Sequence, residues 1–259
     1  MKNFKHIVAI FLIAFSIVSI NAQEETIDKA EEMGMAESKP YKPFNFNLTV
    51  KNMHLWRGYR VTDAPMTAAQ AHYTSKNGKF DAGFWAGAGF NGDYTEMDYY
   101  VSYSSGGFFV SLWDINNYSS FPDAKVFDYD IATTSHFVDL TVGYAFKKIP
   151  FSLSWSTILL GRDSYANDNG DLKNAFSNYV QLNYTVYSGK HSSVGLFAAA
   201  AFSFANETNF YGDNTLNNFG VVFNRDVKVF REKYIPTSAQ VMFNPDQKFV
   251  ALQVALSFF

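Results

Sequence analysis

The sequence contains no cysteine in its 259 residues. This absence excludes a disulfide-bonded scaffold, and it also excludes a lipoprotein whose anchor is attached to an N-terminal cysteine. Any folded part of the chain must therefore hold together without covalent cross-links.

The sequence also lacks an excess of basic residues. Its 21 Lys and Arg are outnumbered by 24 Asp and Glu, which gives a formal net charge of −3, and the sequence pI is near 5.9. A nucleic-acid-binding protein needs a positive surface for the phosphate backbone. We therefore predict no nucleic-acid partner.

Catalytic and metal-binding motifs are missing as well. The five histidines are His6, His54, His72, His136 and His191, and no two of them have the spacing of a metal-ligand pair. We predict that the protein is not an enzyme and that it has no cofactor and no metal.

Two other hypotheses remain open beside that prediction. A membrane-embedded hydrolase would need a histidine and a serine on the lipid side, and the strand phase turns His54 and His136 toward lipid near the outer rim. An interfacial histidine is the commoner explanation. The acidic loop 163–171 could offer Asp163, Asn167 and Asp168 with Asp171 to calcium, but its spacing differs from an EF-hand loop and a solvated loop is the simpler reading.

Only one long apolar run is present, and it lies at the start of the chain. Lys2 and Lys5 precede an apolar segment from Ile7 to about Ile20, and Asn21-Ala22-Gln23 follows. This layout predicts a cleaved secretory signal peptide over residues 1–22, with an uncleaved membrane anchor as the alternative. Residues 23–43 are polar, acidic and end in two prolines, which predicts a flexible lead-in.

The rest of the chain is rich in apolar and aromatic residues that are finely mixed with polar ones. Hydrophobic residues make up 47% and aromatic residues 18% of the chain, yet the mean hydropathy is −0.13. Amphipathic β-strands produce such a mixture. A soluble sandwich turns the apolar face inward, whereas a transmembrane barrel turns it outward and places aromatic residues at both strand ends.

Residues alternate with period two almost throughout from Phe44 to the end. The last segment places Val250, Leu252, Val254, Leu256 and Phe258 on one face and Ala251, Gln253, Ala255 and Ser257 on the other. About twelve such segments are present: 44–56, 66–75, 80–90, 96–104, 108–118, 135–146, 151–160, 176–187, 194–204, about 218–230, 235–243 and 249–259. Their lengths suit tilted membrane strands of about 9–11 residues.

The connections between these segments alternate in length. Short turns follow the second, fourth, sixth and eighth segments, and longer loops follow the first, fifth, seventh and ninth; the brief NGDYT and NPDQ connections break the rule. This asymmetry is typical of an outer-membrane barrel with both termini on the short-turn side. We predict an all-β fold over residues 44–259. It is a transmembrane antiparallel up-and-down β-barrel of about twelve strands, with ten as the alternative, in the outer membrane of a Gram-negative bacterium.

One part of the sequence resembles a known family. Trp56-Arg57-Gly58, the stretch from Phe80 to Trp85, and the acidic-aromatic segment from Glu96 to Tyr103 are similar to the start of the TorF-like porin family. The resemblance is closest over residues 54–103. It implies an outer-membrane barrel and suggests passive transport.

The inner face of the predicted barrel carries charges of both signs. By phase, six charged residues line the pore: Lys51, Arg57, Asp81, Glu96, Asp98 and Asp139. They either line a water channel or seal the barrel as a paired network, since twelve strands lie between the filled and the open barrel sizes.

We predict a porin-like barrel for passive diffusion of small hydrophilic solutes, with outer-membrane lipid as its surroundings and no oligomeric state specified. A non-conducting structural or adhesive barrel is the first alternative, and a membrane-embedded hydrolase is the second. The strand directions place Arg57 at the outer end of the first strand. We expect Glu96 and Asp98 at a similar height and Asp139 somewhat deeper.

Overall fold

The computed structural model describes residues 41–258 except residue 232. The predicted signal peptide (1–22), residues 23–40 of the predicted lead-in and the terminal Phe259 lie outside the described residues. Within the described part of the chain, no helix is long and apolar enough to cross a membrane.

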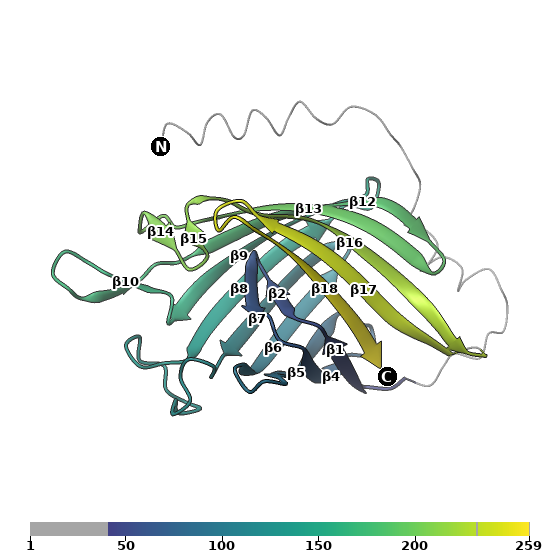
Figure 1. The fold of residues 1–259 in the computed structure, drawn as a ribbon, viewed down its shortest axis with the longest axis horizontal. Coiled ribbons are helices and arrows are strands. Elements are labelled where there is room, and N and C mark those ends of the chain that lie inside the picture. The colour runs from purple at the N-terminus through teal and green to yellow at the C-terminus, as the bar shows by residue number, and fades with distance from the viewer. Residues whose placement is uncertain (1–40, 232, 259) are drawn as a thin grey trace.

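Twelve antiparallel strands form one closed barrel, which confirms the predicted fold class (Figure 1). Its strands are β1 (Phe44–Lys51), β4 (Met66–Thr74), β5 (Phe80–Gly89), β6 (Thr95–Ser105), β7 (Phe108–Asn116), β8 (His136–Ala145), β9 (Phe151–Gly161), β12 (Asn178–Gly189), β13 (Ser192–Phe202), β16 (Thr215–Phe230), β17 (Lys233–Asn244) and β18 (Phe249–Phe258). Strands that are neighbours in the barrel follow one another along the chain, and β1 pairs with β18 to close the ring, with Leu48 opposite Phe258 and Lys51 opposite Ala255.

The period-two pattern of the last strand corresponds to an outer and an inner face. Val250 and Leu252 are 64% and 48% exposed on the outside, whereas Ala251 between them is 5% exposed. Closure leaves no free strand edge in the wall, and in hydrocarbon each unpaired backbone group would cost several kcal/mol. The apolar outside and the continuous ladder are therefore both suited to lipid.

The short connections lie where the sequence predicts them. Residues 75–79, 106–107, 146–150 and 190–191 join strands at one end of the barrel, and the longer segments 52–65, 117–135, 162–177 and 203–214 lie at the other end. Three of these longer segments carry two-stranded sheets of their own: β2 (His54–Trp56) with β3 (Tyr59–Thr62), β10 (Ser164–Ala166) with β11 (Leu172–Asn174), and β14 (Thr208–Asn209) with β15 (Gly212–Asp213).

The predicted first strand, 44–56, is wrong at its C-terminal end. The barrel strand stops at Lys51, because the side chain of Asn52 takes over the next backbone groups of β18. Its Nδ2 donates to Leu252 O (2.9 Å), and its Oδ1 accepts from Val254 N (2.7 Å). The chain then leaves the wall and forms the β2–β3 hairpin.

The tip of this hairpin is the two-residue turn Arg57-Gly58 between the paired residues Trp56 and Tyr59. Both turn residues have positive φ, 45° and 88°. Such a left-handed pair matches the twist of a tight hairpin, and glycine adopts it without steric cost.

The β2–β3 hairpin folds into the lumen of the barrel. Its Leu55 is buried in a cluster with Phe197 of β13, Met242 of β17 and Ala251 of β18. Ala251 belongs to the inner face of its strand. The small inner residues of the wall therefore leave room for a segment of the same chain.

Candidate functional site in the lumen

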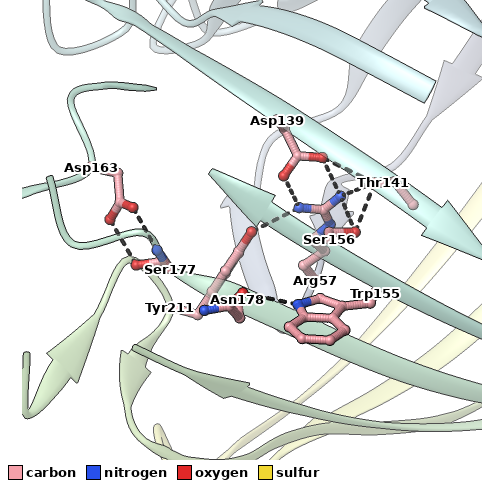
Figure 2. A network of polar contacts seen from close by, with 9 residues as sticks. All are labelled: Arg57, Asp139, Thr141, Trp155, Ser156, Asp163, Ser177, Asn178 and Tyr211. Carbon is pink, nitrogen blue, oxygen red and sulfur yellow. Dashed lines mark hydrogen bonds and ion pairs between the residues drawn. The ribbon is translucent and has the colours of Figure 1, made fainter. Parts of the chain in front are cut away.

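Arg57, at the hairpin tip, is bonded across the lumen to the opposite wall (Figure 2). Its Nη1 and Nη2 lie 2.6 Å from Oδ2 and 2.8 Å from Oδ1 of Asp139 on β8. The same guanidinium donates to the hydroxyls of Thr141 on β8 and Ser156 on β9, at 3.1 and 2.8 Å, and to the hydroxyl of Tyr211 at 2.8 Å. A planar donor fork that faces a carboxylate in this way is both strong and geometrically specific.

The backbone of the hairpin is fixed on its other side. Asn244 Nδ2 on β17 donates to Gly58 O at 2.9 Å, and Leu55 N donates to Gln253 Oε1 on β18 at 2.9 Å. The hairpin thus has side-chain bonds to β8 and β9 and backbone bonds to β17 and β18. It spans the lumen as a bridge.

Aromatic side chains surround the hairpin tip. Trp56 and Tyr59 flank the turn and contact Phe210 and Tyr211, which come from the 203–214 segment, with ring centroids 5.6–6.3 Å apart. The Tyr59 hydroxyl also donates to the backbone oxygen of Phe210. A second outer loop therefore folds inward to hold the first.

A chamber of about 820 Å³ lies beside the hairpin. Its lining combines hairpin residues, inner-wall residues and loop residues: Lys51, His54, Trp56, Arg57, Tyr59, Arg60, Val61, Trp85, Glu96, Asp98, Trp113, Ile115, Asn117, Ser120, Phe121, Phe137, Asp139, Thr141, Arg162 and Phe210. Volumes of about 300–1,000 Å³ are common for small-molecule sites. Both the size and the mixed polar and aromatic lining suit a small polar solute.

Two carboxylates face the chamber from β6. Glu96 accepts from Asn117 Nδ2 at 2.8 Å, and Asp98 accepts from the backbone N of Asn116 at 3.1 Å. On the same side, Lys51 Nζ lies 3.3 Å from His54 Nδ1 and 5.8 Å from the centroid of Trp85. Neither Glu96 nor Asp98 is within salt-bridge distance of a described cation.

Arg162 faces the chamber from the loop that follows β9. Its guanidinium carbon lies 5.2–5.7 Å from the ring centroids of Phe121, Phe137 and Phe210. Its Nε has no hydrogen-bond partner in the described structure. Burial lowers the pKa of this guanidinium, whereas the charge of Glu96 raises it.

Asp81 does not belong to this chamber. It accepts hydrogen bonds from Thr74 (2.7 Å) and Tyr100 (2.6 Å) and lies 2.7 Å from His72 Nδ1. Tyr100 in turn stacks on Trp113 with centroids 4.2 Å apart. Asp81 is thus part of a separate cluster toward the short-turn end of β5.

The structure therefore places five of the six predicted pore-lining residues, Lys51, Arg57, Glu96, Asp98 and Asp139, around one cavity. The predicted location of Arg57 on the barrel wall is wrong, because it lies at the hairpin tip. Arg162 and Phe210 of the 203–214 loop were not predicted. Their lining role depends on how loops fold back, which period-two patterns do not encode.

The two histidines considered for a lipid-side hydrolase have other environments. His54 lies in the hairpin and lines the chamber, which contradicts its predicted lipid-facing direction. His136 is fully buried with its Nδ1 2.7 Å from Asp114 Oδ1, and its Nε2 has no partner among the described residues. No serine is therefore bonded to it.

Two of the four side chains considered for calcium, Asp163 and Asn167, already accept hydrogen bonds from the protein. Asp163 is buried and accepts from both the backbone N and the hydroxyl of Ser177, at 2.8 and 2.7 Å (Figure 2). Asn167 Oδ1 accepts instead from the backbone of Asp171 at 2.8 Å. Among the described residues, 41–231 and 233–258, no group of three His, Asp or Glu side chains has a metal-binding arrangement.

Comparison with known proteins supports the architecture. No family model and no curated protein matches the chain. Among solved structures, the NanC porin is similar with a TM-score of 0.50 and 8% identity, over 83% of this chain and 100% of that one. The fold is that of a transmembrane β-barrel.

Two further porins are similar at lower scores. OccK9 (OpdG) of Pseudomonas aeruginosa has a TM-score of 0.35 and 14% identity over 75% of this chain and 54% of its own. A mutant porin of Rh. blastica has a TM-score of 0.36 and 11% identity over 74% and 55%. At these identities the likeness concerns fold alone.

Proposed function

We propose that the protein is an outer-membrane barrel for the passive diffusion of small hydrophilic solutes, which pass the β2–β3 hairpin through the chamber. The observation that carries the proposal is the polar and charged chamber of about 820 Å³ inside a wall whose outer face is apolar. Water and solutes are stabilised by the charged lining, and lipid is kept outside.

The outer surface supports a location in the outer membrane. Exposed aromatic side chains gather near the short-turn end, including Tyr73, Phe80, Tyr103, Phe108 and Tyr144. Such aromatic girdles occupy the membrane interface in barrels of this class. The predicted export signal and the resemblance of residues 54–103 to TorF-like porins agree with this location.

The hairpin determines the width of the passage in this proposal. It crosses the lumen and carries Arg57, whose charge is balanced by Asp139. Solutes would pass on the chamber side, between the hairpin and the wall formed by β5 to β8. Discrimination would then follow from width and lining charge.

The test is conductance in planar bilayers of protein refolded from the mature chain, together with swelling of proteoliposomes in sugars of increasing size. A variant in which residues 53–64 are replaced by a short Gly-Ser linker should conduct several-fold more, because the lumen loses its bridge. A matched variant with a shortened exposed turn at 167–171 should conduct as the unmodified protein does. A silent hairpin-free variant would contradict the proposal.

A specific observation favours the alternative of a non-conducting structural or adhesive barrel. The hairpin is held from both sides by bonds to β8, β9, β17 and β18, which is the arrangement of a permanent plug. In that case the unmodified protein carries no current and only the hairpin-free variant conducts. Proteoliposome swelling distinguishes the two functions directly.

A further inference from the structure

Arg162 lines the chamber without an ion-pair partner among the described residues, although the charge of Glu96 acts on it from beyond salt-bridge distance. Of the other lining cations, Arg57 is neutralised by Asp139, Lys51 lies 3.3 Å from His54 Nδ1, and Arg60 is exposed to solvent. Arg162 has three phenylalanine rings around it and no carboxylate within salt-bridge distance among the described residues. A guanidinium has five N–H donors in a planar fork that fits a carboxylate. The Arg162 side chain lines the cavity, and its Nε has no hydrogen-bond partner among the described residues.

The opposite chemistry lies on the β6 wall of the same chamber. Glu96 and Asp98 are two residues apart, so their side chains share the inner face of the strand. Glu96 accepts a hydrogen bond from Asn117 and Asp98 accepts one from the backbone of Asn116, and the two carboxyl groups also interact with one another. A carboxylate has about four acceptor positions. Both groups thus retain acceptor capacity toward the chamber.

Aromatic rings complete the lining of the same chamber. Trp85 and Trp113 belong to the inner wall, and Phe137 and Phe210 lie beside Arg162. Ring faces of this kind pack against the apolar faces of a small cyclic or aliphatic molecule. The chamber therefore presents a cation, apolar ring faces and a pair of acceptors.

We propose that the chamber is a binding site for small organic carboxylates that carry hydroxyl groups at their other end, with the carboxylate on Arg162 and the hydroxyls on Glu96 and Asp98. This inference rests on the proposed function and names its solute class. The volume of about 820 Å³ accommodates a sugar acid with several waters.

The competing explanation is that Arg162 only packs on its three rings. Cation–π contacts alone stabilise such an arrangement, by about 0.5–2 kcal/mol each. The two explanations differ in ligand binding, so the decisive measurement is binding and not stability.

The experiment uses the full mature chain folded in detergent and three probes with six-membered rings. Glucuronate has the carboxylate and the hydroxyls, glucose lacks the carboxylate, and cyclohexanecarboxylate lacks the hydroxyls. Binding is followed by calorimetry and by the fluorescence of the chamber residues Trp56, Trp85 and Trp113. We expect glucuronate to bind at least about tenfold more tightly than either of the others.

The variants assign the two ends of the site. Arg162→Gln should remove the preference for glucuronate over glucose, and Arg162→Lys should restore part of it. Glu96→Gln with Asp98→Asn should reduce the preference for glucuronate over cyclohexanecarboxylate. The control Arg225→Gln, an exposed arginine at the short-turn end of β16, should leave all three affinities unchanged.

Equal affinity for the three probes in the unmodified protein would overturn the proposal even if Arg162→Gln failed to fold. An unchanged preference in folded Arg162→Gln would overturn it as well. Failure of the proposed function is recognised separately. If the protein binds glucuronate but carries no current, the binding site is supported and the proposed passage is contradicted. If the protein conducts but shows no preference for carboxylates, the passage is supported and the binding site is contradicted.

Discussion

Arg57 and Asp139 form a two-point ion pair inside the lumen, 82 positions apart in the sequence, with N–O distances of 2.6 and 2.8 Å. Asp139 is 1% exposed. The pair joins the tip of an outer loop to the barrel wall, so its strength and the width of the passage are connected.

We expect Arg57→Ala to destabilise the barrel and to raise conductance. Removing one partner leaves the buried Asp139 carboxylate uncompensated, which typically costs about 3–5 kcal/mol. Urea unfolding of protein in lipid vesicles gives the free energy, and planar bilayers give the conductance. The double variant Arg57→Ala with Asp139→Asn should lose less stability than Arg57→Ala alone, and a larger loss would contradict the ion-pair interpretation.

The same chamber should show charge-dependent ion selectivity. Asp98→Asn removes a buried acidic side chain from the lining, so we expect the reversal potential in a KCl gradient to shift toward anions. Arg57→Ala should shift it toward cations. Asp123→Asn, in the exposed part of the 117–135 loop, serves as the control and should leave the potential unchanged. Identical selectivity in all of these conducting barrels would show that the chamber is not on the ion path.

The hairpin turn offers a test that changes no charge. Gly58 has φ +88°, and an added Cβ would lie 3.0 Å from Asn217 O. Gly58→Ala should therefore loosen the hairpin and increase open-channel noise. Gly78→Ala has a similar left-handed strain at φ +68° but no atom within 4 Å of its Cβ. It is the matched control and should leave the noise as it is, because Gly78 lies in an exposed turn far from the hairpin.

The two faces of the wall differ in their tolerance of charge. Leu252→Arg places a cation in lipid and should cost about 2–4 kcal/mol if the position lies near the bilayer midplane. Ser154→Arg should cost much less, because Ser154 is on the inner face opposite Gln181. Equal losses in vesicle folding experiments would contradict the assignment of inside and outside.

Cysteine labelling on intact cells tests the orientation of the barrel. Asp168→Cys lies in an exposed long loop and Asn77→Cys in an exposed short turn at the other end. A membrane-impermeant maleimide should label the first and not the second. Because the natural chain has no cysteine, neither result needs a correction for background.

The period-two alternation in the sequence was sufficient to predict the strands that form the wall of the barrel. Each strand is read by its own alternation, as β18 illustrates, and the pairing of β1 with β18 follows from the requirement that no edge stays open. The inward direction of the charged side chains on β6 and β8 could also be predicted from the sequence. The alternation alone decides on which face of a strand each residue lies.

The hairpin could not be predicted in this way. Residues 52–56 continue a plausible strand, and only the contacts of Asn52 with β18, some 200 positions away, end it. The Arg57-Gly58 pair is a sequence signal for a turn, since glycine tolerates positive φ. The position of Arg162 depends on Phe121 and Phe210 from two other loops, and no local pattern contains that information.

The origin of the hairpin near the N-terminus has a consequence for assembly. It precedes its partners on β8, β9, β17 and β18 in the chain, and those on β17 and β18 belong to the last strands. The bridge can dock only after the ends of the sheet have met, because before that moment Asn244 and Gln253 are not in place. We therefore expect folding in two kinetic steps, a slower insertion of a water-filled ring followed by quenching of Trp56 as the loop settles. The late step reports that the ring has closed correctly.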